Sequence, residues 1–468
     1  RRRHTRFRNV TGVQTCALPI SITCNGFTLA SGGTYTSTSF SIVGTGTLTS
    51  TGKTISSLTV NGSGITSTLA DALTTGTTAT TSFLLGTLDL NNQTLTTGIF
   101  SSTTGATRVL AFGTTGSIVL VHTTAGTTVL SMANASAFTF TGTSNITAGM
   151  STTRTFNFGG TAGATTSNRL NINLTSGASV PTFTGSFRQI NFTGSTCNPG
   201  AQTISCHGFT LASGGTYSST DFTTVGTGTI TYTGKSISSL AINGSGITTT
   251  LADAGINSDI TLTNGTLDLA GNTLTSSAKV TTNAGTKNIT FNGGTLICAG
   301  SGGNCWSNAN PTGFTTTAGT GTGTISLTNS SAKTFTGGGS TYNCTLNQGG
   351  AGALTITGSN TFNDITNTTQ PASVLFTAAT TNTFNNFSLS GTAGNLITIG
   401  SVTAAQHTLS KSSGTVSISY CSISYSNATG GATWQAFTSN GNVNGGNNTG
   451  WDFGAVVGGG GNFFLLLQ

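Results

Sequence analysis

Apolar and polar residues alternate along most of the chain in short runs. Ile55–Val60, Leu85–Leu90 and Leu170–Leu174 are examples, and each run is bounded by Gly or by small polar residues. A period of two, filled by β-branched and aromatic residues, is typical of strands that bury one face. No segment carries a helical pattern of comparable clarity. The pattern therefore predicts an all-β protein built from many short strands.

A long internal duplication organises these strands. Residues 24–72 and 206–254 align without gaps at a displacement of 182 positions, and 38 of the 49 pairs are identical. A second repeated unit, GTLDLNNQTLT at 86–96 and GTLDLAGNTLT at 265–275, is displaced by 179. Stacked coils tolerate such small losses at their corners. The duplication therefore specifies an architecture, although it contains no nucleophile, metal or phosphate-loop spacing.

We predict a parallel β-helix, that is, a β-solenoid of stacked coils. The fold suits a long chain without linker-like breaks, with aliphatic and Phe side chains stacked inside and Thr and Asn in outer ladders. The alternative is a series of stacked β-sandwiches, because Asn-Gly pairs suit two-residue hairpin turns. In a solenoid the same dipeptide would turn a corner through the left-handed conformation. The pairs are Asn61-Gly62, Asn243-Gly244, Asn264-Gly265 and Asn292-Gly293.

The pattern divides the chain into five segments. Residues 21–205 hold the first repeat copy and residues 206–370 the second, both as solenoid. Residues 371–453 are expected to form the C-terminal coils and an aromatic cap, because Trp and Tyr concentrate there. Residues 454–468 form a Gly-rich and apolar tail that is too short to span a membrane.

Residues 1–20 form the remaining segment, and we interpret them as foreign to the protein. Read back into codons, Arg1–Arg6 and Val10–Ile20 both fit one sequencing adapter, and similarity between the repeat copies begins only at Ser21. The alternative is a short basic targeting or nucleic-acid-binding arm. If these residues are translated adapter, the first coils near Ser21 should lack a cover.

This interpretation changes the charge balance. The formal charge of +7 includes five arginines from the first segment, and without them ten basic side chains face eight aspartates, a charge of +2. We therefore infer no nucleic-acid partner from the basicity. Charged residues make up 5% of the chain and there is no Glu, so the usual composition of solvent-exposed helices is missing. No run approaches the length of a membrane-spanning helix.

Cysteine spacing suggests two loop disulfides. Cys197 and Cys206 bracket a turn sequence, and so do Cys298 and Cys305. In an extracellular setting such pairs are expected to be oxidised, whereas the alternative is buried free thiols. A zinc site is not expected, because no Cys-x-x-Cys pair occurs and the histidines are scattered.

The aspartates do not predict a catalytic site. Repeat-equivalent pairs, Asp89 with Asp268 and Asp71 with Asp253, lie many coils apart, so we expect corner or outward-facing carboxylates that accept hydrogen bonds from backbone. We predict no catalytic residue, cofactor or metal. A polysaccharide-degrading enzyme on the same scaffold remains the alternative, and it requires two carboxylates in one groove beside Lys or Arg. Irregular Thr-x-Thr units also leave ice binding open.

Two stretches resemble known proteins. Residues 334–368 and 409–431, with the GGNNTGWDF close, resemble repeat-rich structural proteins of tailed bacteriophages and of uncultured bacteria, and the GTLDLNNQTLT unit resembles β-helical coils of filamentous adhesins. The resemblance implies a non-enzymatic structural or adhesive protein at the virion or cell surface, a tail fibre or spike-like component or a secreted bacterial adhesin. We expect a surface glycan or host receptor as the partner. A phage fibre can also be a homo-oligomer such as a trimer, although the sequence shows no interface pattern for one. No catalytic residue is carried over.

Overall fold

The computed structural model describes residues 20–132, 134, 137–149, 153–158, 170–175, 177 and 180–454. The segment assigned to adapter, apart from Ile20, and the tail after Gly454 lie outside the described residues. The chain divides into two compact units near residues 150–170, ahead of the second repeat copy. Unit 1 contains the described residues up to Gly149 with Arg154–Phe158 and Leu170, and unit 2 contains Thr153 and those from Asn171 onward.

Each unit consists of short strands separated by turns. The strands of unit 1 are β1 (Ile20–Cys24), β2 (Phe27–Thr28), β3 (Tyr35–Ile42), β4 (Gly46–Thr49), β5 (Thr54–Leu69), β6 (Leu73–Thr75), β7 (Thr80–Asp89), β8 (Thr94–Thr97), β9 (Ile99–Ser101), β10 (Arg108–Ala111), β11 (Ser117–Leu120), β12 (Thr127–Ser131), β13 (Phe138–Thr141), β14 (Ile146–Gly149) and β15 (Arg154–Phe158). The strands of unit 2 are β16 (Asn171–Thr175), β17 (Thr182–Phe192), β18 (Thr203–Thr210), β19 (Tyr217–Thr224), β20 (Gly228–Thr231), β21 (Ser236–Leu251), β22 (Gly255–Asp268), β23 (Thr273–Thr282), β24 (Lys287–Thr290), β25 (Thr295–Cys298), β26 (Gly302–Ser307), β27 (Phe314–Thr317), β28 (Gly323–Leu327), β29 (Lys333–Thr336), β30 (Thr341–Gln348), β31 (Leu354–Thr357), β32 (Thr361–Asn367), β33 (Ala372–Phe376), β34 (Thr381–Ser388), β35 (Ile397–Ser401), β36 (His407–Ser410), β37 (Thr415–Ser417), β38 (Cys421–Ile423), β39 (Ser426–Thr429), β40 (Thr433–Gln435), β41 (Val443–Asn444) and β42 (Trp451–Asp452).

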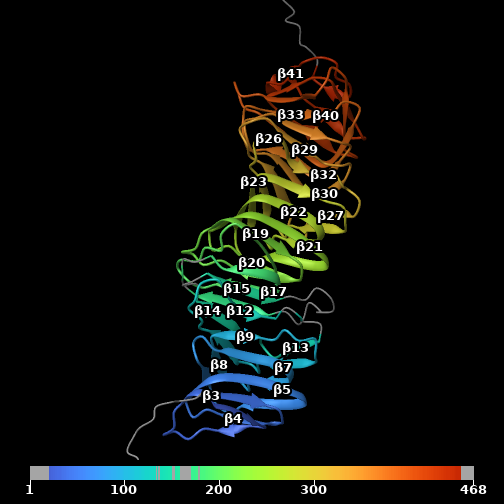
Figure 1. The fold of residues 1–468 in the computed structure, drawn as a ribbon. Helices are drawn as coiled ribbons and strands as arrows, with labels where there is room; N and C mark the ends of the chain where they lie inside the picture. The colour runs from blue at the N-terminus through green and yellow to red at the C-terminus, as the bar shows by residue number, and fades with distance from the viewer. Residues whose placement is uncertain are drawn as a thin grey trace, which may run out of the picture. The chain divides into compact units, whose positions relative to one another are not determined.

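The predicted parallel β-solenoid is confirmed. Within each unit the paired strands run parallel, and the strands of interior coils lie beside their counterparts one coil earlier and one coil later (Figure 1). Among the described residues, the antiparallel pairing is limited to an isolated bridge between Thr392 and Asn395, and the helical structure to one 3₁₀ turn, Thr438–Asn440.

The coils differ in length. Side-chain hydrogen bonds between neighbouring coils connect residues 18 positions apart at Ser39 and Ser57, and 26 positions apart at Thr282 and Asn308. Strands keep their register while the turns absorb the difference, which is how a displacement of 182 becomes 179 without loss of pairing. The turns therefore differ in length from coil to coil, and this makes the surface uneven.

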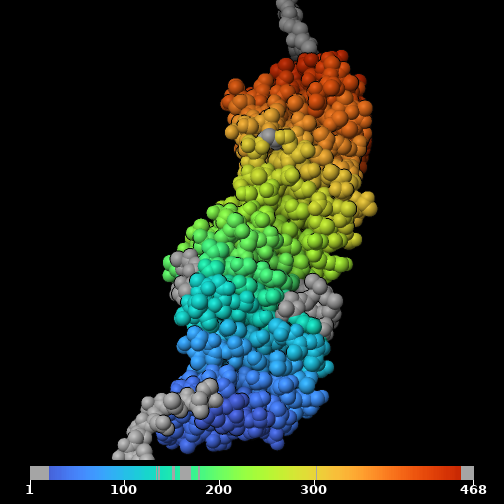
Figure 2. Space-filling view, viewed as in Figure 1, coloured from blue at the N-terminus to red at the C-terminus, as the bar shows by residue number. Residues whose placement is uncertain are grey.

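Alternating burial builds the core. In β5, Leu58 and Val60 are fully buried, while Thr59 between them is partly exposed. The repeat-equivalent strand β21 buries Leu240 and Ile242 in the same way. Fully burying each such side chain contributes about 1.5–3 kcal/mol. On the face shown in the space-filling view, the side chains of each unit pack without a wide opening (Figure 2).

The Asn-Gly pairs do not form hairpins. Asn61-Gly62 and Asn243-Gly244 lie inside β5 and β21, where the register shifts and the chain bends from one face of the coil to the next. Asn292 and Gly293 turn a corner with φ of 50° and 83°. Asn292-Gly293 thus has the left-handed corner conformation expected of a solenoid, whereas Asn61-Gly62 and Asn243-Gly244 do not have positive φ. The parallel pairing of β5 and β21 removes the evidence for sandwiches.

Aromatic side chains close the core of the last coils. Trp434 and Trp451 pack edge to face with ring centroids 5.0 Å apart, and Phe387 lies 5.5 Å from Trp434. The strands that carry the two Trp residues, β40 and β42, form a separate three-stranded sheet with β37. We call Phe387, Trp434 and Trp451 the aromatic cap.

Candidate functional site

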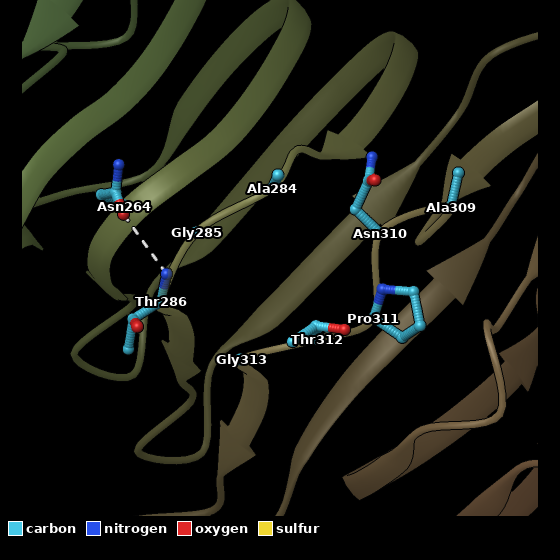
Figure 3. A pocket seen from close by; sticks show the side chains of 9 residues that line it. All are labelled: Asn264, Ala284, Gly285, Thr286, Ala309, Asn310, Pro311, Thr312 and Gly313. Atoms are coloured by element: carbon cyan, nitrogen blue, oxygen red, sulfur yellow. Dashed lines mark hydrogen bonds between the residues drawn. The ribbon is translucent and has the colours of Figure 1, made fainter.

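A surface pocket of about 600 Å³ lies in unit 2, and we take it as the candidate site (Figure 3). Its walls come from three turns in successive coils. The lining residues are Asn264, Ala284, Gly285, Thr286, Ala309, Asn310, Pro311, Thr312 and Gly313.

Strand pairing brings the three turns together. Gly265 of β22 pairs with Lys287 of β24, and Lys287 pairs with Phe314 of β27. The residues just ahead of these three positions therefore stack at one corner of the solenoid. The turn 309–313 has no counterpart of similar length in the preceding coil, because the coil that contains it is longer, and the extra residues form one wall of the pocket.

A buried lysine ties two of the turns together from below. The Lys287 side chain is 1% exposed, and its Nζ donates hydrogen bonds to the carbonyl oxygens of Gly285 at 3.0 Å, Asn310 at 2.8 Å and Thr312 at 3.0 Å. Three donors meet three acceptors, so the ammonium is satisfied without a carboxylate. Burial lowers the pKa of Lys287 from its ordinary value.

Glycine and asparagine shape the opposite wall. The backbone N–H of Thr286 donates to Asn264 Oδ1 at 3.2 Å, as the dashed line in Figure 3 shows. Gly285 has a φ of 141°, and a Cβ there would lie 2.2 Å from the carbonyl oxygen of Thr263 and 2.5 Å from Asn264 Oδ1. Only glycine fits this approach of two coils.

A smaller depression of about 150 Å³ adjoins the pocket and shares Thr286 with it. Its outer surface follows one row of the parallel ladder, in which Thr248 pairs with Thr266, Thr266 with Asn288, and Asn288 with Thr315. Thr315 Oγ1 donates to Asn288 Oδ1 at 3.0 Å. The row presents hydroxyl and amide groups at the ladder spacing of about 4.8 Å.

The chemistry of the pocket is that of binding. Asn264, Thr286, Asn310 and Thr312 offer amide and hydroxyl groups, and Pro311 adds an apolar surface. None of the nine lining side chains ionises near neutral pH, so the lining supplies no general acid, base or nucleophile. A ligand rich in hydroxyl groups matches such a lining.

Corner aspartates bind backbone, as the sequence predicts. The Asp71 carboxylate accepts hydrogen bonds from the N–H groups of Ser50 at 2.7 Å and Thr51 at 2.6 Å, and Asp253 makes the same two bonds in the second copy. Asp89 and Asp268 each accept from the N–H two residues further on, at 2.9 Å. These four carboxylates stabilise turns.

Another row of charged residues escaped the sequence analysis. On the outer face of unit 2, Asp221 pairs with Ser239, Ser239 with Asp259, and Asp259 with Lys279. Ser239 Oγ donates to Asp221 Oδ1 at 2.7 Å. The successive spacings of 18 to 20 residues equal one coil each, and that signal could have placed the four residues in one row. None of them lines either pocket.

The predicted disulfides are not formed in the structure. Cys197, Cys206, Cys298 and Cys305 are free thiols, and all four are buried. Cys197 Sγ lies 3.9 Å from the carbonyl oxygen of Leu174, whereas Cys206 points into the core opposite Phe187. Burial raises the pKa of Cys206 to about 12 and that of Cys305 to about 11. The thiols behave as small core residues.

His, Cys and Asp side chains do not gather in threes anywhere in the described part of the chain. Among the same residues, no helix has the length and apolarity needed to cross a bilayer. Comparison of the chain with protein families, with curated proteins and with solved structures found no match.

Proposed function

We propose that the chain is a non-enzymatic structural or adhesive surface protein, a phage virion component of the tail-fibre or spike type. In this proposal the solenoid forms a stiff shaft at the virion surface, and the pocket at Asn264, Thr286 and Asn310 contacts a host-surface glycan. Trimerisation of the shaft is part of the proposal. A secreted bacterial adhesin would use the same surface in the same way.

The observation that supports the proposal most is the uncharged, hydroxyl- and amide-lined pocket on a hydrogen-bonded parallel ladder. Sugars are recognised by planar and bidentate hydrogen bonds to such groups, and a rigid site loses little entropy on binding. The buried Lys287 clamp and the glycine at position 285 hold the turns in place before any ligand arrives. Parallel ladders also leave few backbone groups open to a protease.

Binding to host polysaccharide tests the proposal. The purified chain is titrated against surface glycans from candidate bacteria, and Asn264→Ala and Asn310→Ala are compared with Asn385→Ala, a change at an exposed asparagine outside the pocket. We expect each pocket substitution to weaken binding about fivefold, the equivalent of one lost hydrogen bond, and the control to leave it unchanged. Equal binding by all four chains would place the glycan site elsewhere.

Polysaccharide cleavage is the second candidate, and the row Asp221–Ser239–Asp259–Lys279 favours it. Two ladder steps separate the carboxylates by about 10 Å, close to the upper end of the range for inverting glycosidases, roughly 6.5–9.5 Å. Release of reducing ends from a polysaccharide, lost in both Asp221→Asn and Asp259→Asn, would establish this activity and overturn the non-enzymatic proposal.

A further inference from the structure

Among the residues that the structure describes, none covers the apolar end of the first coil of unit 1. Strand β1 pairs with β3, and no second strand partner lies on its other side among the described residues. Ile20 is 54% exposed and Ile22 is 39% exposed. Large apolar side chains at a strand edge are unfavourable in water and mark a surface that another strand can cover.

The second repeat copy shows the same surface when it is covered. Ile204 and Cys206, the equivalents of Ile22 and Cys24, are 0% exposed. Strand β17 lies over them in parallel register, with Phe187 opposite Cys206 and Ile190 opposite Phe209. The receiving sequences are nearly identical, so the difference in burial comes from the presence of the covering coil.

The local fold of the two copies is otherwise the same. The backbone N–H of Ala30 donates to the hydroxyl oxygen of Tyr35 at 3.1 Å, and Ala212 donates to Tyr217 at the same distance. Tyr217 is 1% exposed because the covering coil packs on it, with the Phe192 ring 5.1 Å away, whereas Tyr35 is partly exposed. The open end of unit 1 is therefore already in the conformation that accepts a coil.

Two repeat-equivalent glycines, Gly32 and Gly214, give independent evidence that this end accepts a coil. A Cβ on Gly214 would lie 2.1 Å from the carbonyl oxygen of Ser195 in the covering coil, so glycine is required there. Its equivalent Gly32 has no atom within 4 Å of the same point. The glycine at position 32 would therefore let a coil approach as closely as the covering coil approaches Gly214.

We propose that the open end formed by β1, β2 and Gly32 is a docking surface for one further parallel β-coil, of the kind that covers the equivalent surface in the second repeat copy. The coil has the chemistry of residues 182–202, with apolar side chains at the positions of Phe187, Ile190 and Phe192. The named strands of the described residues pair in parallel, whereas a second copy meeting this end head to head would have to pair antiparallel. A parallel coil could also lie against Gly32 as closely as Ser195 lies against Gly214.

A chain with an added coil tests the proposal. Residues 1–20 are replaced by a second copy of residues 182–202, so that Gln202 of the copy precedes Ser21, as it precedes Thr203 in the second repeat. The matched control carries Phe187→Asp and Ile190→Asp in the added copy only. The rate at which a thiol reagent labels Cys24 is followed by peptide mapping, and Cys206 in the same chain serves as the buried reference.

We expect the added coil to slow labelling of Cys24 at least about tenfold, toward the rate of Cys206, and the control to label like the unaltered chain. Equal labelling of Cys24 in the added-coil and control chains, with β5 protected from hydrogen exchange in both, would overturn the proposal. Protection of Cys24 that grows with the concentration of the unaltered chain would also overturn it, because a second copy would then be the occupant.

Discussion

Lys287 Nζ donates a 2.8 Å hydrogen bond to the carbonyl oxygen of Asn310, a residue in the wall of the pocket. The first repeat copy places Arg108 at the equivalent strand position, where it pairs with Gly86 as Lys287 pairs with Gly265. Arg108 is also fully buried and donates to the carbonyl oxygens of Ala106, Ser102 and Asn134. A buried cation that donates hydrogen bonds to several backbone carbonyls thus occurs at the same position in both repeat copies.

Replacing the lysine by an apolar side chain should loosen the pocket. Lys287→Met leaves three carbonyl groups without their donor, and we expect the free energy of unfolding to fall by about 3 kcal/mol and glycan binding to be lost. Lys287→Arg should retain most of the stability, because the equivalent site in unit 1 accommodates Arg108. Denaturant unfolding measures both, and an equal loss in the two variants would show that side-chain shape, and not hydrogen bonding, is what the site requires.

A side chain added at Gly285 should disturb the wall of the same pocket that Asn264 forms. Gly285→Ala places a Cβ 2.2 Å from a backbone oxygen at a φ of 141°, so we expect a loss of about 2 kcal/mol or more and weaker binding. Gly293→Ala is the control, because its φ is also positive but nothing lies within 4 Å. It should cost about 1 kcal/mol and leave binding intact. Thermal unfolding and glycan titration would separate the two effects.

The aromatic cap should stabilise the last coils locally. Trp451→Ala removes a 9% exposed ring that packs on Trp434, and we expect a loss of about 3–5 kcal/mol. Because each coil contacts only its neighbours, hydrogen exchange should accelerate in β37, β40 and β42 and not in unit 1. Trp451→Phe, which loses the hydrogen bond from Nε1 to Ser426 Oγ and part of the ring but keeps an aromatic face on Trp434, should cost less, about 1–2 kcal/mol. Uniform loss of protection along the chain would contradict a local role.

Acid should weaken the coil that contains His407. This side chain is fully buried, stacks on Phe376 with centroids 4.8 Å apart, and has neither ring nitrogen hydrogen bonded. Burial lowers its pKa to about 4, below the unfolded value of about 6.5. The unfolded chain therefore takes up the proton first as the pH falls, so stability is fully present above about pH 6.5 and is lost down to about pH 4, by roughly 3 kcal/mol.

His407→Phe should remove this dependence, because the ring then carries no titrating nitrogen while its stacking on Phe376 is kept. Thermal unfolding of the two chains between pH 7 and pH 4 would test this. A wild-type loss of stability over this interval that persists unchanged in the variant would assign the acid sensitivity to other groups.

The sequence predicts the architecture well because the signal is local and repeated. Alternation at Leu58 and Val60 defines which residues face inward, and the duplication shows that the same coil can be stacked again. The Asn-Gly pairs were ambiguous by themselves, since the dipeptide tolerates left-handed φ in a hairpin and in a corner alike. Only the parallel register resolves that choice.

The candidate site could not be read in the same way. It depends on which turns stack, and neighbouring coils differ in length there, because Gly265 pairs with Lys287 and Lys287 pairs with Phe314. No fixed period in the sequence therefore places the three turns at one corner. Lys287 looks like an ordinary surface residue in the sequence, because nothing local shows that three carbonyls from two turns surround it. The row that contains Asp221 and Asp259 could have been predicted from the sequence by applying the spacing of one coil to the aspartates.

The aromatic cap makes the last coils of unit 2 different from the first coil of unit 1. Coils added beyond Trp451 would have to displace two packed indoles, whereas the end at β1 exposes unpaired strand edge and apolar side chains. A coil inserted ahead of the aromatic cap in unit 2 would leave the packing of Trp434 on Trp451 unchanged, because each coil contacts only its neighbours.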